Sequence, residues 1–229
     1  MRVAIITPEL TNKGGIERII LVSARALGAD IYTGKYFPER TFPEFKNLSV
    51  TVLDQTSKRS RFSSLMLRRK FSALRLKGYD YHILHGGPSL ALASHHKNVI
   101  WYCHAPTRWL YDMYLEEKKK FSGVKRIAFI LISALLRRLD QCAVRHVDII
   151  LANSDFTRKR IKTYYGRDSR VVYPPVDLNA FTFVRPGDFF LSSARVDPIK
   201  RIDLIVQAFQ ALPDQQLIVA SGGPDLERI

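Results

Sequence analysis

The sequence predicts an α/β protein with a doubly wound parallel sheet, in which helices cover both faces. Short apolar runs alternate with polar or helical stretches along the 229 residues, and this alternation is typical of parallel strands joined by helical crossovers. Hydrophobic residues make up 46% and charged residues 25% of the chain, as in ordinary globular proteins. The length allows one large domain, or one domain and part of a second.

The first element is expected to be a strand, because residues 3–7 form an apolar run that ends at Pro8. Gly14 and Gly15 then precede a predicted helix. Glycine lets backbone N–H groups approach an anion closely, so this turn is a candidate phosphate loop. Because the full G-x-G-x-x-G pattern is absent, a simple tight turn is the alternative. The apolar positions at helical spacing are Ile16, Ile19, Ile20, Ala24 and Leu27.

His104 follows one of the later strands of the predicted sheet and so lies at its carboxyl edge, on the same crevice as the glycine turn. A purely structural histidine is the alternative. Farther along, Ser154 is placed to cap a helix that Phe156 begins, and Pro174 and Pro175 stiffen the exit from the last strand, which begins at residue 171. The other strands are expected at residues 31–33, 50–53, 81–85, 99–103 and 147–151.

A further strand, loop and helix are expected between Phe189 and Phe209. Arg195 and Lys200 lie on the loop, beyond the carboxyl end of the strand and before the helix N-terminus. Ligands bind in such crevices, and a guanidinium with an ammonium could hold a diphosphate without a metal. The alternative is two solvated loop charges. A second strand at residues 216–220 and a helix that starts at Asp225 complete the chain.

The formal net charge of +15 favours an anionic partner, namely nucleic acid, a membrane or an anionic substrate. Between Lys58 and Lys77, cations alternate with apolar residues and no acidic residue occurs. This segment is interpreted either as a helix on an anionic membrane or as a surface helix whose apolar face is core. Residues 124–139 are interpreted as a buried helix that covers the sheet, with a membrane element as the alternative. No nucleic-acid recognition motif occurs, so no nucleic acid is expected.

Two cysteines, Cys103 and Cys142, lie far apart beside apolar residues, and both are expected to be buried free thiols in a reducing compartment. His95 and His96 are interpreted as a surface pair, because no second group of metal ligands lies near them. The first strand directly follows Met1, and no apolar run reaches the roughly 20 residues of a membrane span. We therefore expect a cytoplasmic protein, with peripheral contact to the inner membrane face as a further expectation.

Several stretches resemble the retaining nucleotide-sugar glycosyltransferases of family 4, which have the GT-B fold. Residues 193–204, SARVDPIKRIDL, are similar to the family pattern G-R-L-x-P-x-K-G/R-x-D-L. Residues 104–112, HAPTRWLYD, resemble H-T-P-x-R-Y-x-x-D, with alanine and tryptophan in place of the usual threonine and tyrosine. The glycine pair with Glu17 and Arg18, the ANSDFT stretch at residues 152–157 and the PPVD run that starts at Pro174 also match.

The resemblance implies a Rossmann-like acceptor-side domain at residues 1–178, an interdomain connection at 179–187 and an incomplete start of the nucleotide-sugar-binding domain at 188–229. It implies transfer of a sugar, mannose from GDP-mannose as the best match, to a lipid-linked or polysaccharide acceptor with retention of configuration. No cofactor and no metal are expected, and the leaving phosphate would take the acceptor's proton. The implied catalytic residues are His104, Arg195 and Lys200, and the implied substrate-binding residues are Gly14, Gly15, Arg108 and Asp112.

Two other kinds of function remain open from the sequence. A second domain of about 45 residues is too small to close a nucleotide-binding fold, so this chain by itself is expected to be an incomplete enzyme. The first alternative is a non-catalytic fragment that binds the acceptor or a membrane. The second is a nucleic-acid-binding protein, which the charge suggests and the lack of a recognition motif opposes. A nicotinamide enzyme is disfavoured, because the glycine turn lacks its third glycine and no acidic residue is placed at the end of the second strand. The donor base, the acceptor and the linkage are not fixed by the sequence.

Overall fold

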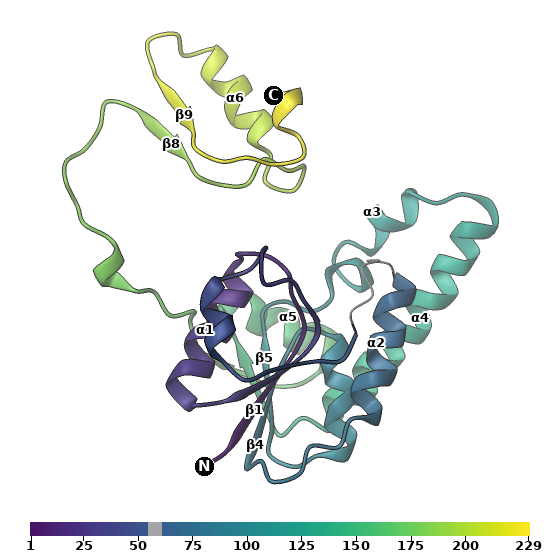
Figure 1. The fold of residues 1–229 in the computed structure, drawn as a ribbon. Helices are drawn as coiled ribbons and strands as arrows, with labels where there is room; N and C mark the ends of the chain where they lie inside the picture. Colours follow the sequence, from purple (N-terminus) through teal and green to yellow (C-terminus); the bar gives the residue numbers. More distant parts are fainter. Residues whose placement is uncertain (55–60) are drawn as a thin grey trace. The chain divides into compact units, whose positions relative to one another are not determined.

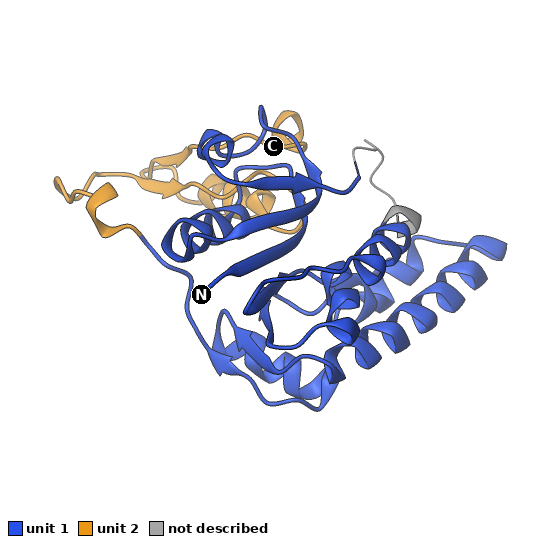
Figure 2. Cartoon of the chain, turned by 60° about the horizontal axis from the view of Figure 1, so that its bottom comes forward, with its two compact units in different colours: residues 1–176 blue, residues 177–229 orange. Residues whose placement is uncertain are grey.

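The structure, a computed structural model, describes residues 1–54 and 61–229, and of residues 61–63 only the secondary structure is described. The chain forms two compact units, residues 1–176 and 177–229, which Figure 2 shows in different colours. Each unit has its own parallel sheet. Lys58 and Arg59, which belong to the predicted basic segment, lie outside the described residues.

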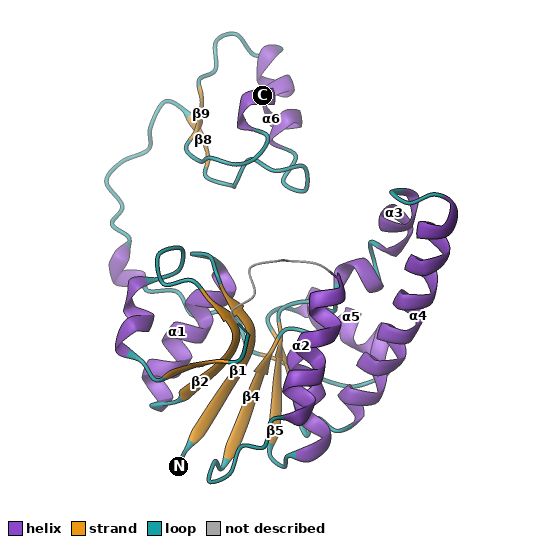
Figure 3. Cartoon of the chain, turned by 45° about the vertical axis from the view of Figure 1, so that its right-hand side comes forward, coloured by secondary structure: helices purple, strands orange, loops and turns teal. Residues whose placement is uncertain are grey.

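The first unit is built on a seven-stranded sheet in the order β3-β2-β1-β4-β5-β6-β7, in which every neighbouring pair is parallel. The N-terminal strand therefore lies in the interior of the sheet, and the chain winds outward from it in both directions (Figure 3). This confirms the predicted doubly wound sheet. The strands are β1 Val3–Leu10, β2 Asp30–Tyr36, β3 Val50–Val52, β4 Tyr81–His85, β5 Val99–Cys103, β6 Ile149–Ala152 and β7 Arg170–Val171.

Helices lie on both sides of this sheet, with α1 on one side and α2 and α4 on the other (Figure 1). The helix α5 begins after Ser154, whose hydroxyl accepts the Thr157 N–H at 3.2 Å, so the predicted N-cap is confirmed. The α-helices are α1 Gly15–Leu27, α2 Arg61–Ala73, α3 Tyr114–Lys119, α4 Gly123–Arg145 and α5 Asp155–Tyr165. Short 3-10 helices occupy Pro43–Asn47, Pro88–His95, Arg108–Leu110 and, in the second unit, Leu178–Ala180 and Leu226–Arg228.

The core has two halves because successive side chains of a strand point to opposite faces of the sheet. Along β1, Val3 and Ile5 belong to the half under α1, whereas Ala4 and Ile6 belong to the half under α2 and α4. All four side chains are buried, and residues 3–6 of the strand are apolar without a break. Burial of both faces explains why the sequence shows a continuous run here rather than an alternating one.

The helix α4 is apolar on two faces, of which one is buried. Phe129, Leu136 and Val144 pack inward, whereas Val124 and Leu131 are 83% and 65% exposed. The prediction of a buried helix is therefore right for one face of α4 and wrong for the other. Periodicity alone identifies apolar positions and does not say which of two apolar faces has a partner.

The two cysteines are both free, but they differ in burial. Cys103 is buried at the end of β5, as predicted. The prediction is wrong for Cys142, which is exposed because it falls on the outer face of α4, eleven residues after Leu131, about three helical turns. Within the described residues, no helix combines the length and the apolar composition that crossing a membrane requires.

The second unit contains two parallel strands and one α-helix, β8 Phe190–Ser192, β9 Leu217–Val219 and α6 Ile202–Gln210. Its small core centres on Val196 and Ile202, which are both buried. Gly223 packs directly on the backbone of Val196, where an added Cβ would lie 2.0 Å from the Val196 carbonyl oxygen. A glycine is required at this close approach.

Candidate active site

An open cleft of about 830 Å³ lies at the carboxyl edge of the first unit's sheet. This is the edge at which open α/β sheets bind their ligands. Every residue that lines the cleft belongs to the first unit. The residues come from the ends of β1, β2, β4 and β5 and from α1, α2 and α3, and among them are Thr7, Glu9, Glu17, Lys35, Asp54, Gly86, Gly87, His104, Thr107, Arg108, Trp109 and Glu117.

His104 is one of these lining residues, and it follows β5 directly as the sequence predicts. Its ring stacks on His85 with the centroids 5.1 Å apart and lies against Tyr102 at the same distance. Its backbone oxygen accepts the Thr157 hydroxyl at 3.4 Å, which ties the residue to the start of α5. Burial lowers the pKa of His104 to about 4, so the imidazole is neutral at pH 7. A neutral imidazole can donate one hydrogen bond and accept another without bringing a charge to the cleft.

His85 is a site residue that the sequence reasoning missed. It ends β4, and its Nδ1 lies 2.9 Å from the Nε2 of His104. The side chain is fully enclosed, and burial lowers its pKa well below the usual value. Its Nε2 has no hydrogen-bond partner among the residues that the structure describes. A buried N–H without a partner is costly, so the favoured tautomer carries its proton on Nδ1 and donates it to His104. His104 then accepts at Nε2 and carries its own proton on Nδ1.

Removing this donor should change the tautomer of His104. Leucine at position 85 is expected to allow the Nε2-H tautomer of His104, whereas His85→Asn places an amide N–H near the lost Nδ1 and is expected to keep the Nδ1-H form. Proton-nitrogen correlation spectra of the histidine rings distinguish the two tautomers. The same spectrum for wild type and for His85→Leu would show that His85 does not set the tautomer.

A buried ion pair supports the floor of the cleft. Arg68 of α2 donates to the Asp140 carboxylate of α4 at 2.5 Å and to the carbonyl oxygen of Gly87 at 3.2 Å, and the Arg68 and Asp140 side chains are 8% and 2% exposed. Burial raises the pKa of Asp140 to about 6, although Arg68 acts in the opposite direction. Gly87 is held closely, since an added Cβ would lie 2.7 Å from the Thr107 hydroxyl oxygen.

This pair corrects the membrane interpretation of the segment between Lys58 and Lys77. Arg68 faces Asp140 in the interior, and Leu67 and Phe71 belong to the core. The apolar face of α2 is therefore core, as the alternative interpretation predicted. Arg68 is not available to a lipid surface, and Lys70 pairs with Asp54 at 3.3 Å.

Arg108 lines the cleft at the start of the short helix after His104. Its Nε donates to the Asp112 carboxylate at 3.1 Å, and Arg160 of α5 donates to the other oxygen of that carboxylate. Asp112 is not among the lining residues, so in this structure its contact with a substrate would pass through Arg108. Substrate binding by Asp112 and by Arg108 both stay predictions, and of the two only Arg108 lines the cleft.

The glycine turn holds a carboxyl group at the place predicted for a phosphate. Gly14 caps α1, and a Cβ on Gly14 would lie 2.6 Å from the Glu17 Oε2. Burial raises the pKa of Glu17, while backbone N–H groups, including that of Gly14, lower it. An anion at this turn would meet the Glu17 carboxyl, so phosphate binding by Gly14 and Gly15 requires this side chain to move or to take a proton.

In the second unit, Arg195 and Lys200 lie on the loop between β8 and α6, as the sequence predicts. Arg195 forms a two-pronged contact with the Asp197 carboxylate at 2.8 and 3.1 Å, and its side chain is 68% exposed. The other Asp197 oxygen accepts the backbone N–H groups of Ile199 and Lys200 at 3.0 and 3.1 Å. Asp197 thus fixes the loop and orients the guanidinium, and it is a second residue that the sequence reasoning did not single out.

The adjacent histidines His95 and His96 differ in their surroundings. His96 is not simply a surface residue, because its Nε2 accepts the Leu76 N–H at 2.9 Å and its Nδ1 lies 3.1 Å from the Leu92 oxygen; the surface interpretation holds for His95. No group of three metal-ligating side chains occurs in residues 1–54 and 61–229.

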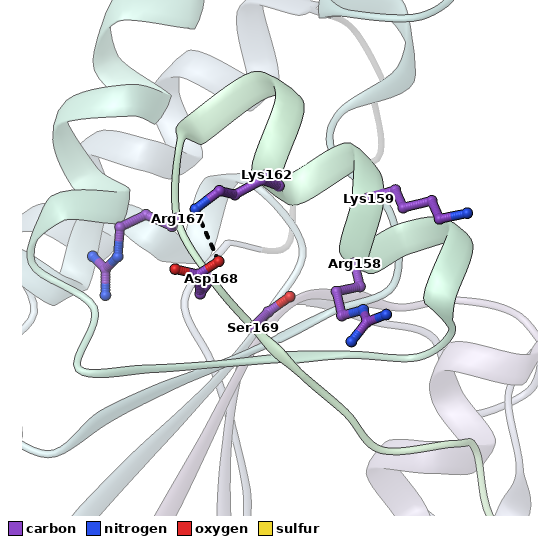
Figure 4. Close-up of a pocket in the computed structure, with 6 residues that line it drawn as sticks. All are labelled: Arg158, Lys159, Lys162, Arg167, Asp168 and Ser169. Atoms are coloured by element: carbon purple, nitrogen blue, oxygen red, sulfur yellow. Dashed lines mark hydrogen bonds and ion pairs between the residues drawn. The ribbon is translucent and has the colours of Figure 1, made fainter.

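A basic hollow of about 250 Å³ lies at the end of α5. There Lys162 reaches Asp168 (Figure 4), and Arg167 donates to the carbonyls of Val144 and Val147.

Comparisons with known proteins agree with this architecture. The profile of Glycosyltransferase Family 4 matches residues 13–180. The alpha-1,3/1,6-mannosyltransferase ALG2 of Mus musculus is 28% identical in a match that covers 93% of this chain and 59% of the relative. ALG2 of Candida glabrata is 27% identical and covers 98% of this chain and 55% of the relative. The chain thus spans somewhat more than half the length of these relatives.

Among solved structures, the crystal structure of Anabaena HepE in complex with UDP and glucose matches with a TM-score of 0.62. The sequence identity is 16%, and the match covers 95% of this chain and 60% of the other. At this identity the similarity concerns the fold.

Proposed function

Because the chain belongs to glycosyltransferase family 4 and has the family's GT-B type of fold, we propose that it serves the transfer of a sugar from a nucleotide-sugar donor to an acceptor hydroxyl. The observation that carries the proposal is the cleft at the carboxyl edge of the first sheet, with a neutral histidine at its wall. A sugar offers hydroxyl groups that donate and accept hydrogen bonds, and the polar side chains of the cleft are suited to such a ligand.

The proposed roles follow from the chemistry of each side chain. His104 positions the transferred sugar through a hydrogen bond, and Arg108 binds substrate beside it. Arg195 and Lys200 stabilise the negative charge that develops on the leaving diphosphate, because fixed cations do this better than water. The orientation of Arg195 by Asp197 supports this role, since a preorganised donor costs no rearrangement at the moment of reaction. No protein group is assigned as general base, since the leaving phosphate can take the proton of the acceptor.

Mannose is the sugar that we propose, with GDP-mannose as donor and a lipid-linked or polysaccharide glycan as acceptor. The support is that two relatives which match nearly the whole chain carry the name of a mannosyltransferase. The contacts around His104 and Arg108 are compatible with any hexose, so the choice of sugar rests on the relatives.

The test is an assay of labelled sugar transfer from GDP-mannose, UDP-glucose and a dTDP-sugar to a membrane lipid extract. It is run with residues 1–229 and with the product of the natural gene read to its stop codon. We expect transfer by the gene product from GDP-mannose, at a rate at least about tenfold above the other donors. Equal use of another donor would overturn the assignment of mannose. No transfer from any donor, together with retention of the lipid-linked glycan on the protein, would favour the non-catalytic acceptor-binding alternative.

A further inference from the structure

The exposed apolar face of α4 is a feature of the first unit that the proposed reaction does not use. Four of its side chains, Val124, Ile127, Leu131 and Leu135, follow one another at intervals of three or four residues and are 83%, 59%, 65% and 50% exposed. Ile132 and Leu139 flank them and are also exposed. We call these six residues the α4 stripe. Over fifteen residues of helix it is about 22 Å long.

A stripe of this kind needs an explanation, because a helix that is apolar all round is normally buried. The opposite face of α4 is already packed, with Phe129 and Leu136 buried and Asp140 paired with Arg68. Single exposed apolar residues are common on soluble proteins, whereas a contiguous row of them marks an interaction site.

The charges around the stripe indicate which partner covers it. The exposed cations of α4 are Lys125, Arg126, Arg138 and Arg145, and its one acidic residue, Asp140, is buried on the other face. A helix with an apolar row whose exposed charges are all cations complements the interface of an anionic lipid bilayer, where acyl chains lie below a layer of negative headgroups. The long stems of Arg and Lys allow the apolar row to enter while the charges stay at headgroup level.

We propose that α4 docks the protein on an anionic lipid surface through the α4 stripe. The same surface would be brought close to the cleft, because Arg137 of α4 donates to the carbonyl of Leu110 at 2.5 Å, at the end of the short helix that carries Arg108. Delivery of a lipid-linked acceptor to the cleft rests on the proposed function, whereas docking itself does not.

The probe is cosedimentation with vesicles of phosphatidylcholine alone or with about one third phosphatidylglycerol. Because each cation at an anionic surface contributes about 1 kcal/mol, we expect the wild type to bind the anionic vesicles at least about tenfold more tightly than the neutral ones. In Leu131→Ser with Leu135→Ser, we expect binding to fall by at least about tenfold. In Arg126→Gln with Arg138→Gln, the preference for anionic vesicles should largely disappear.

A matched control uses two exposed apolar residues outside the stripe. Val22 and Phe156 lie on α1 and α5 and are exposed, so Val22→Ser with Phe156→Ser makes the same chemical change elsewhere and should bind as the wild type does. In Leu135→Trp the emission of the new tryptophan should shift to the blue on anionic vesicles, and in Phe156→Trp it should not. Circular dichroism and thermal unfolding identify any variant that has lost its fold.

Two results would overturn the proposal. The first is unchanged vesicle binding by the folded serine variant of Leu131 and Leu135. The second is absence of vesicle binding by the wild type, combined with a dimer in light scattering that the same serine variant abolishes, because the stripe would then be covered by a second copy of the chain. Neither result depends on sugar transfer, so failure here is distinct from failure of the proposed function.

Discussion

Methionine in place of Arg68 is expected to lower the free energy of unfolding by about 3–5 kcal/mol at pH 7, because it leaves the Asp140 carboxylate buried without its partner. Methionine retains most of the volume of the arginine stem, so the decrease in the free energy of unfolding comes from the unpaired charge rather than from a cavity. The second Asp140 oxygen already has no hydrogen-bond partner among the described residues, so no neighbour is positioned to compensate. Urea unfolding gives the free energy directly.

The pH dependence of this loss has a defined sign. Burial raises the pKa of Asp140 to about 6 even beside Arg68, and removal of the cation raises it further. The unfolded chain loses the same proton near pH 4. Above that pH the folded variant binds a proton that the unfolded chain does not, so its stability falls as the pH rises. The deficit relative to the wild type should therefore be smaller at pH 5 than at pH 7.

A double variant separates the effect of the unpaired Asp140 charge from the effects of lost packing and lost hydrogen bonds. Arg68→Met with Asp140→Leu removes both members of the pair and leaves no buried ion, so we expect it to recover most of the stability that the single variant loses. If the double variant is as unstable as Arg68→Met alone, the loss comes from the missing contact with Gly87 or from packing, and the ion pair is not its cause.

Alanine in place of His104 is expected to reduce kcat of sugar transfer by about 10²–10³-fold in the product of the natural gene, the size of effect seen when one hydrogen-bond donor to a reacting group is removed. Because the pKa of His104 is lowered to about 4, its contribution should be constant between pH 6 and pH 8. His95→Ala is the matched control, since His95 is exposed and does not line the cleft. A normal kcat for His104→Ala would remove His104 from the reacting site.

The strands were the part of the fold that the sequence predicted best. The strands β4 and β5 coincide with the predicted runs at residues 81–85 and 99–103. The run of β5 is apolar throughout and almost entirely buried, which makes its ends easy to place. The helix α3 was not predicted, since its six residues are too short for a helical period to emerge. Cys142 and the α4 stripe were misassigned because an apolar neighbourhood in sequence does not reveal which face of a helix meets the core.

The same limit applies to the candidate site: residues within a local motif could be placed from the sequence, whereas contacts between residues far apart in the sequence could not. His104 and Arg195 follow predicted strands and belong to local sequence motifs, so their positions at strand ends could be predicted. The Arg68–Asp140 pair joins residues 72 positions apart, and nothing near either residue indicates the other. His85 had a usable signal: it ends a predicted strand next to that of His104, and the carboxyl ends of neighbouring parallel strands meet at one edge.

The interior position of β1 in the sheet has a consequence for synthesis of the chain. Its partner β2 follows within a few dozen residues, whereas its other partner, β4, ends at His85. At about 5–20 residues per second, the ribosome delivers β4 roughly 2–10 s after β2. During that interval one edge of the strand is unpaired, although residues 3–6 of it are apolar, and unpaired edges are where nascent chains misassemble. The nascent protein should therefore depend most on chaperones between the emergence of β2 and that of β4.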